Sequence, residues 1–395
     1  MSKKRLIYLD HAATTPVDPA VFKKMQPYFC SKYGNPSTIY SLGEETSSAV
    51  EQARLKIAGF LNCLPEEIYF TGSATESDNW IVNGVIEKLD FGKSAKPHFI
   101  ISSIEHKAIL EPCRVLSKKG KIELTLLPVD RDGLVKVKDV KESIQKNTRL
   151  ISIMYANSEI GSIQPIREIG QMIKRVNEDK KEPIIFHSDA VQAINYLNCQ
   201  VDYLNVDSLS LSGHKIYGPK GIGALYIKKG TRISPFIRGG GQERNMRSGT
   251  ENVSGIVGLA EAIERVKKTR TKNKSIEKMR DKLIRRILES VVNSKVNGSL
   301  KKRLPNNAHF SFKRAEGEGT VIDLSERGIC TSTGSACASG SLSPSRTLLA
   351  IGLSPEEAHS SIRFTLGRQT TNTDINYVLK ILPEVISRLR KISGR

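Results

Sequence analysis

Strand-like runs alternate with helical stretches through residues 1–262 of this 395-residue chain. The runs are short and rich in apolar or small residues, and the stretches between them repeat apolar residues at helical spacing. The predicted strands are Glu67–Phe70, His98–Ser102, Leu150–Met154, Ile184–His187, Ser208–Ser212 and Ala224–Ile227, and the predicted helices lie within Glu44–Leu61, Glu76–Leu89 and Ile166–Val176. Such alternation favours a mostly parallel sheet covered by helices on both faces. We therefore predict an α/β fold.

The pattern changes after about residue 262. A long helix is followed by short strands near Ala308–Phe312 and Ser361–Thr365 and by a closing helix over Asp374–Arg390. A chain of this length can form two domains. We predict a large domain over residues 15–262, and a smaller α+β domain built from residues 1–14 and 263–395.

Composition indicates the compartment. No segment approaches the roughly 18 consecutive apolar residues of a membrane span. The first residues are basic but lack an apolar core, so we do not expect a signal peptide. The six cysteines are scattered without a CxxC pair, which suits a reducing compartment and argues against a disulfide framework or a structural zinc site. We expect a cytoplasmic protein that does not enter membranes.

The net charge of +20 raises the question of nucleic-acid binding. The basic residues are densest from Arg265 to Arg286, and apolar residues recur at helical spacing in the second half of that stretch. They are Ile276, Met279, Leu283, Ile284, Ile287 and Leu288. The pattern favours an amphipathic helix with a solvated basic face, because no aromatic residues interleave as a base-stacking surface requires. Direct nucleic-acid binding is not expected.

Lys215 is the first candidate for chemistry. It follows the predicted strand Ser208–Ser212, beside His214 and before Gly218 and Pro219. A solvated lysine in a turn fits this segment as well as a lysine that loses its proton and attacks a carbonyl carbon. Other residues must decide between the two.

Several other segments contain residues that would serve a lysine-bound pyridoxal phosphate (PLP), which needs an acid at its pyridine nitrogen, a phosphate cradle and a ring support. Asp189 ends an apolar run, at the carboxyl edge of a strand where α/β proteins bind ligands. The turn Thr71–Glu76 opens a helix and suits a phosphate, although alone it is equally a plain helix cap. Further candidates are Ser212 and His214 for the phosphate, Gln192 for the ring hydroxyl, and His106 for stacking on the ring.

Taken together, these segments resemble the cysteine desulfurases, in the group that includes the iron–sulfur-assembly and nitrogen-fixation enzymes. The resemblance covers nearly the whole chain. It is carried by the segments Tyr8–Pro16, Tyr33–Ser37, Ala74–Asn79, Glu105–Lys107, Asn157–Gly161, Ser212–Lys215, Arg247–Thr250, Gly334–Cys337 and Ser361–Phe364, in this order and spacing. The resemblance implies PLP fold type I, in the class V aminotransferase branch, and a homodimer.

The resemblance also implies roles for individual residues. Lys215 would bind the cofactor covalently, Asp189 would hold its pyridine nitrogen and His106 would stack on its ring. The implied phosphate ligands are Ala74, Thr75, Ser212 and His214, with Thr250 reaching the phosphate of the neighbouring subunit. Gln192 would touch the ring hydroxyl, and Asn157 and Arg363 would belong to the substrate pocket.

Arg363 and Cys337 fit these implied roles physically. The planar guanidinium of Arg363 can hold an α-carboxylate in two bonds, and its neighbours Ile362 and Phe364 suggest a strand facing a core. Cys337 lies within Thr331–Ser345, which is almost wholly Ser, Thr, Gly and Ala. We expect an exposed loop whose thiol attacks sulfur and carries it outward as a persulfide. The other five cysteines are interpreted as structural, with Cys330 the least certain of them.

We therefore expect a cysteine desulfurase that converts L-cysteine to L-alanine while loading sulfur on Cys337, with His106 as an acid–base helper. Selenocysteine lyase and aminotransferase activities would use the same Lys215 and Asp189, and a nucleic-acid-binding protein with a decayed site is the alternative of another class. The acceptor stays open between a cluster scaffold, a tRNA-thiolation enzyme and another sulfur carrier, because the chain ends soon after its closing helix whereas iron–sulfur-assembly members commonly continue. We expect no stable metal site, although a persulfide on Cys337 could ligate a nascent cluster transiently.

Overall fold

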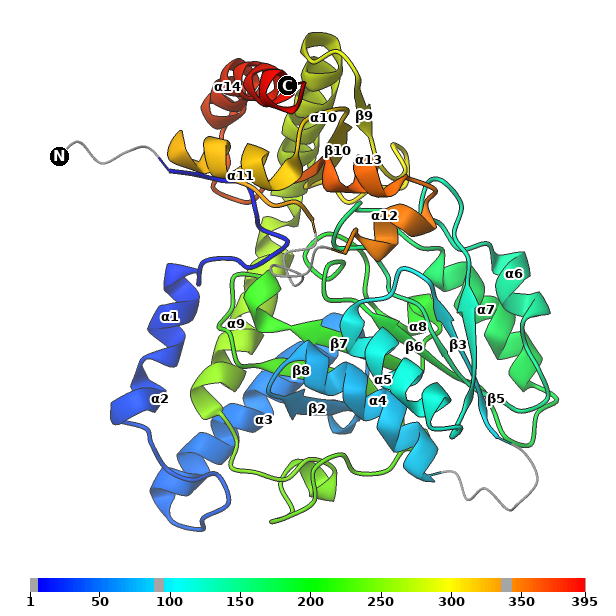
Figure 1. Cartoon of the computed structure of the whole chain (residues 1–395). Helices are drawn as coiled ribbons and strands as arrows, with labels where there is room; N and C mark the ends of the chain where they lie inside the picture. The colour runs from blue at the N-terminus through cyan, green and yellow to red at the C-terminus, as the bar shows by residue number, and fades with distance from the viewer. Residues whose placement is uncertain (1–5, 89–95, 335–342, 395) are drawn as a thin grey trace.

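The computed structural model describes residues 6–88, 96–334 and 343–394. Within these ranges, seven strands form one twisted sheet in the order β2-β8-β7-β6-β5-β3-β4 (Figure 1). The strands are β2 (Ile68–Thr71), β3 (His98–Ser102), β4 (Glu123–Leu127), β5 (Thr148–Ser152), β6 (Ile185–Asp189), β7 (Ser208–Ser212) and β8 (Gly223–Ile227). All run parallel except β8, which is antiparallel to both of its neighbours. The predicted α/β fold with a mostly parallel sheet is confirmed.

Helices cover both faces of this sheet because alternate residues of each strand point to opposite sides. On one face, α4 (Ala74–Lys88) and α5 (Lys107–Lys118) share a core with Phe99 and Ile101 of β3. On the other face, Ile100 belongs to a core formed with α3 (Ser41–Leu61), α7 (Ile166–Asn177) and α9 (Val253–Thr269). Shorter helices are α1 (Pro19–Met25), α2 (Pro27–Cys30), α6 (Val137–Glu142) and α8 (Val201–Leu204).

A second group of elements lies at one end of the sheet, at the top of Figure 1. An antiparallel sheet in the order β12-β10-β9 packs with three helices around its own hydrophobic core. The elements of this part are α10 (Asn273–Ser290), β9 (Ser294–Val296), β10 (Asn307–Phe312), α11 (Gly317–Glu326), β11 (Ile329–Cys330), α12 (Arg346–Ala350), α13 (Pro355–His359), β12 (Ser361–Thr365) and α14 (Asn372–Ser393). The start of the chain joins this group, because β1 (Ile7–Tyr8) pairs with β11. The division into domains at residue 262 stays a prediction.

The basic stretch from Arg265 to Arg286 differs from the single amphipathic helix that was predicted. It is divided between α9 and α10, with a 3₁₀ turn at Arg270–Lys272 between them. Leu288, assigned to the apolar face, is exposed. Arg280, counted among the basic residues, is buried. Its guanidinium donates to the carbonyl of Leu304 at 2.9 Å and to Asp281 at 2.7 Å, and these bonds compensate for the burial of its charge.

The described cysteines occupy different environments. Cys113 and Cys199 are buried, Cys63 and Cys330 are partly buried, and Cys30 is exposed at the end of α2. A packing role is therefore not supported for Cys30. Among the described helices, none has the length and apolar character needed to cross a bilayer.

A buried ion pair joins α3 to the loop after β8. The guanidinium of Arg54 makes two bonds of 2.8 Å to the carboxylate of Glu243, which also accepts the N–H of Phe70 at 2.9 Å. Both side chains are almost fully buried. Removing Glu243 leaves the buried charge of Arg54 with only the exposed carboxylate of Glu51 and the carbonyl of Ile68 as partners.

We predict that Glu243→Ala lowers the free energy of unfolding by about 3–5 kcal/mol, measured by urea denaturation of the apoprotein. The matched control is Glu289→Ala, which breaks the exposed pair with Arg286 and should cost at most about 1 kcal/mol. Equal effects of the two substitutions would contradict this account of the pair.

Candidate functional site

A cavity of about 650 Å³ opens between the carboxyl ends of β6 and β7, the start of α4 and strand β12. The structure brings most of the predicted site residues to its wall. These are Ala74, Thr75, His106, Asn157, Asp189, Gln192, Ser212, His214, Lys215 and Arg363. They come from segments more than 280 residues apart in the chain.

Lys215 ends a 3₁₀ turn, Gly213–Lys215, that directly follows β7. Its Nζ donates to the carbonyl oxygens of Ala12 at 2.7 Å and Ala13 at 2.6 Å. The amide of Gln192 also donates to Ala12 O, at 3.0 Å. The N-terminal segment thus holds Nζ of Lys215 at the cavity wall. The 3₁₀ turn that follows β7 fixes the position of the Lys215 backbone.

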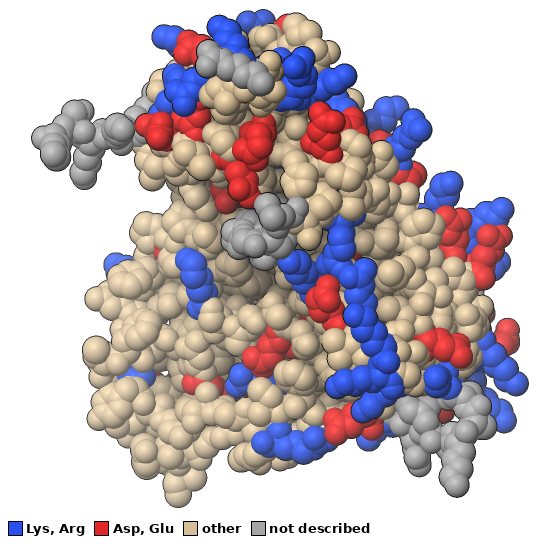
Figure 2. Space-filling model, viewed as in Figure 1, with Lys and Arg blue, Asp and Glu red and all other residues tan. Residues whose placement is uncertain are grey.

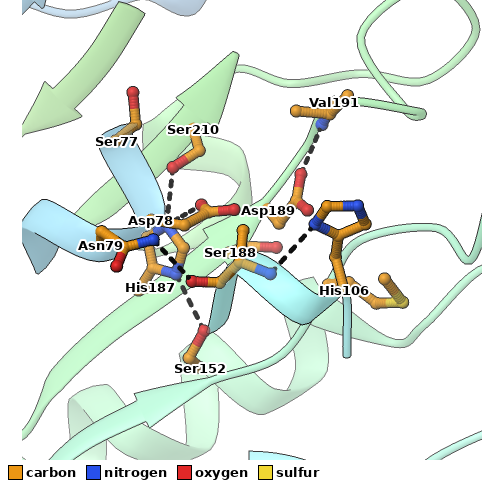
Figure 3. Close-up of polar contacts among 12 residues, drawn as sticks. Ser77, Asp78, Asn79, His106, Ser152, His187, Ser188, Asp189, Val191 and Ser210 are labelled. Atoms are coloured by element: carbon orange, nitrogen blue, oxygen red, sulfur yellow. Dashed lines mark hydrogen bonds and ion pairs between the residues drawn. The ribbon is translucent and has the colours of Figure 1, made fainter. Parts of the chain in front are cut away.

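Asp189 is the last residue of β6 and is buried. One carboxylate oxygen accepts the N–H of Val191 at 2.9 Å (Figure 3). Burial raises the pKa of this carboxyl, whereas the nearby His106 and Lys215 and the Val191 N–H lower it. An acid at this place can bind a protonated ring nitrogen.

His106 caps α5, since its Nδ1 accepts the N–H of Ala108 at 3.2 Å (Figure 3). This contact leaves Nε2 as the ring nitrogen that can carry a proton, and it fixes the orientation of the imidazole. The ring lies near Asp189 at the cavity wall.

Phosphate-binding groups gather at the start of α4. The first N–H groups of this helix, at Ala74 and Thr75, have no partner within the helix and can bind an anion. Ser212 and His214 approach from the end of β7. Burial and the charges of Lys215 and Lys220 lower the pKa of His214 to about 4, so the imidazole is neutral at physiological pH. Its Nδ1 contacts the hydroxyl of Thr14 at 3.1 Å.

Arg363 lies in β12, and its neighbours Ile362 and Phe364 are buried as expected. Its guanidinium donates to Asp10 at 2.7 Å, to Ser158 O at 2.9 Å and to Gly334 O at 3.1 Å. Nε is buried without a hydrogen-bond partner among the described residues, so the side chain can still bind an anionic group.

Asn157 also lines the cavity, but its amide is engaged within the protein. Oδ1 accepts the N–H groups of Glu159 and Ile160, and Nδ2 donates to Ile104 O. In this structure Asn157 stabilises the turn that carries Ser158 towards Arg363. Its role as a substrate ligand stays a prediction.

Two predicted residues are not placed in this cavity. Thr250 is exposed on the loop before α9 and does not line the cavity of its own chain. Cys337 lies outside the described residues, between Gly334 and Ser343. In the described part of the chain, no group of His, Cys, Asp or Glu side chains is arranged to hold a metal ion.

Three buried acidic residues that received no role from the sequence also line the cavity: Asp78, Glu105 and Glu159. Each lies in a segment already singled out, within three residues of Thr75, His106 or Asn157 in the chain. A single acidic residue in a polar segment gives no sign in the sequence that it is buried. The available signal was that an acidic residue recurs in three such segments.

The residues present fit PLP. Lys215, the candidate covalent anchor, lines the same cavity as the carboxylate of Asp189 and as the hydroxyl, imidazole and helix N–H groups that can bind a phosphate. The buried Nε of Arg363 provides for a substrate carboxylate. This donor set matches a cofactor with one ring nitrogen, one phosphate and one aldehyde carbon.

Comparison with known proteins agrees with this geometry. Residues 7–378 match the family described as aminotransferase class-V. The chain is 48% identical to a cysteine desulfurase IscS of Dictyoglomus turgidum, over 99% of this chain and 97% of the relative. It is 45% identical to one of Methanosarcina thermophila, over 99% and 95%.

Solved structures agree as well. A NifS-like protein superposes with a TM-score of 0.89 at 38% identity, covering 97% of this chain and 100% of the other. A protein described as SspA in complex with cysteine gives 0.79 at 38% identity, covering 91% and 98%.

The fold and the site therefore define a PLP-dependent enzyme of fold type I. The chain belongs to the aminotransferase class-V family, and the predicted resemblance to the cysteine desulfurases within it is confirmed.

The buried Glu105 makes stability depend on pH. Burial raises its pKa to about 8, although its Oε1 accepts the Ser102 hydroxyl at 2.5 Å and the Met154 N–H at 2.8 Å. Above pH 4.5 the unfolded chain loses this proton while the folded protein keeps it to about pH 8. The contribution of Glu105 to stability therefore falls as pH rises through this window and is constant above it.

We predict that Glu105→Gln, which keeps the acceptor oxygen, gains stability relative to the parent protein as pH rises from about 5 to about 8. Urea denaturation of both apoproteins across this range measures the difference. A difference that does not change with pH would show that Glu105 is ionised in the folded protein.

Proposed function

We propose that the chain removes sulfur from L-cysteine to give L-alanine, with Lys215, His106 and Cys337 as catalytic residues. The observation that carries this proposal is the convergence of Lys215, Asp189 and Arg363 on one cavity. The relatives named cysteine desulfurase and the neighbour solved with cysteine support the substrate.

The binding residues divide the cavity by chemistry. Ala74, Thr75, Ser212 and His214 hold the phosphate, while Gln192 contacts the ring hydroxyl and His106 stacks on the ring. Asp189 keeps the pyridine nitrogen protonated, and the chemistry that bound PLP then supplies is withdrawal of electrons from the substrate α-carbon. Arg363 binds the substrate carboxylate through its buried guanidinium.

Three side chains take part in the reaction. The Nζ of Lys215 takes the α-proton of the substrate, and the imidazole of His106 exchanges a proton beside the departing sulfur. The Cys337 thiolate forms a bond to the substrate sulfur as the carbon–sulfur bond breaks. The β-carbon keeps that electron pair and gains a proton, which completes the methyl group. The Nζ of Lys215 returns a proton to the α-carbon, so that alanine is released and a persulfide stays on Cys337.

We predict that Lys215→Ala abolishes visible absorption by bound cofactor. Cys337→Ala should keep that absorption but lose sulfide release from cysteine in the presence of dithiothreitol, because no thiolate accepts the sulfur. Cys63→Ala, which replaces a partly buried cysteine that does not line this cavity, is the control and should release sulfide at the parental rate. Parental release by Cys337→Ala would overturn the assignment.

We also propose that two copies of the chain form a homodimer in which Thr250 reaches the phosphate of the partner's cofactor. The surface around α1, α2 and the start of α3 is largely uncharged in Figure 2. It exposes large apolar side chains, namely Phe22, Phe29, Tyr33, Ile39 and Tyr40. Clusters of this kind mark protein interfaces.

We predict that Ile39→Asp converts the dimer to a monomer in sedimentation velocity and weakens PLP binding, because the partner's Thr250 is lost. Ile39 is 93% exposed in the single chain. The control is Ile392→Asp in α14, which replaces an exposed isoleucine of the other group of elements and should leave the dimer intact. A dimer that survives Ile39→Asp with unchanged affinity for PLP would contradict this interface.

The persulfide sulfur would pass to an acceptor for iron–sulfur cluster assembly, for tRNA thiolation, or for both. The relatives named IscS support sulfur transfer of this kind. A transient cluster contact through Cys337 and a cytoplasmic location belong to the same proposal.

A further inference from the structure

A layer of polar side chains is buried between α4 and the sheet, next to Asp189. His187 of β6 lies at its centre, with Nδ1 2.9 Å from the Ser152 hydroxyl of β5 and Nε2 3.0 Å from the Ser210 hydroxyl of β7. Asp78, in the first turns of α4, places Oδ1 3.6 Å from the same Nε2 (Figure 3). Ser210 is also the side-chain hydrogen-bond partner of Asp78.

Three buried carboxyl groups meet here: Asp78, Asp189 and Glu105. The charged groups that act on Asp78 are the other two carboxyls, from β6 and from the segment before α5, and both oppose its ionisation. The imidazole packed against it does not compensate, because burial lowers the pKa of His187 to about 3 and keeps it neutral. Oδ1 of Asp78 has no hydrogen-bond partner among the described residues.

Asp189 faces a different environment. Lys215 acts on it with positive charge, and the Val191 N–H donates to it. Two interacting carboxyls in a buried site cannot both be ionised without a large cost, so one of them keeps a proton. The ammonium of Lys215 and the Val191 N–H lie on the side of Asp189, and the proton therefore resides on Asp78.

We propose that Asp78 is a positioning residue, held as a neutral carboxylic acid, which makes Asp189 the single ionised member of this buried pair. The inference rests on the proposed role of Asp189 at the pyridine nitrogen. Asp78 acts through Asp189: it fills the space beside that carboxylate without adding a second negative charge.

The hydrogen bonds of the layer have two possible directions. If Asp78 is neutral, it donates to Ser210, Ser210 donates to Nε2 of His187, and the Nδ1–H of His187 donates to Ser152. If Asp78 is ionised, each donor and acceptor exchanges and His187 carries its proton on Nε2. The tautomer of His187 therefore reports the protonation of Asp78.

Infrared difference spectra of the full-length protein test the proton directly. The parent spectrum minus that of Asp78→Asn should show the carbonyl stretch of a protonated carboxylic acid at neutral pH. Glu105→Gln is the matched control, and its band should fade near pH 8. In ¹⁵N spectra, His187 should be the Nδ1–H tautomer. A missing Asp78 band or an Nε2–H tautomer would overturn the proposal.

Cofactor binding provides a second test. If Asp78 only filled space, its substitution would not change the pH dependence of the visible absorption. Asparagine is neutral and can donate to Ser210, so Asp78→Asn should retain the parental PLP affinity and pH dependence of the visible absorption. Asp78→Ala cannot donate and should bind PLP about tenfold more weakly. If Asp78→Asn instead shifts the pH dependence, the parent carries a charge at Asp78 and the proposal fails.

Asp189→Asn separates this inference from the proposed function. Unchanged pH dependence of the absorption in that variant would remove Asp189 from the pyridine nitrogen, whereas the infrared band of Asp78 would still show where the proton lies.

Discussion

The site depends on a negative charge that is buried at the carboxyl edge of a parallel sheet. Asp189 ends β6 at the place where neighbouring strands also end, so backbone N–H groups and side chains from several loops can reach it. A buried carboxylate is costly unless it is paired. The ammonium of Lys215 reduces this cost, and Lys215 is also a group that the proposed reaction requires. The groups that stabilise the charge of Asp189 are therefore in the positions that chemistry at the ring nitrogen would also require.

The two ends of the chain complete the cavity that the sheet begins. The carbonyls of Ala12 and Ala13 hold Nζ of Lys215, and Asp10 holds the guanidinium of Arg363. The segment that carries these groups is itself fixed, because β1 pairs with β11 and Leu9 lies in the C-terminal core. Lys215 and Arg363, the proposed covalent anchor and substrate-binding residue, are thus placed relative to each other through the first residues of the chain.

Much of this could be predicted from the sequence, since strands buried on both faces leave a strong apolar pattern. Strands β3, β7 and β12 begin and end where they were expected. The residues that were missed depend on long-range packing. Asp78 and Glu105 appear as ordinary polar residues of a helix start. Asp78 is buried against His187 of β6 and Ser210 of β7, and Glu105 against Ser102 of β3 and Met154 after β5. The buried Arg280 was hidden for the same reason, because its partner Leu304 lies 24 residues further along.

The guanidinium of Arg363 is held in place by the protein without any bound ligand. Its Nη groups are already held by Asp10, Ser158 O and Gly334 O, so little side-chain freedom remains to be lost on binding. The unpartnered Nε is what remains for an incoming carboxylate. Because Gly334 O shares the same guanidinium, the arginine joins the cavity to the residues just before the segment that contains Cys337. Under the proposed function, a carboxylate bound at Arg363 would therefore lie at a fixed place relative to Gly334, where that segment begins.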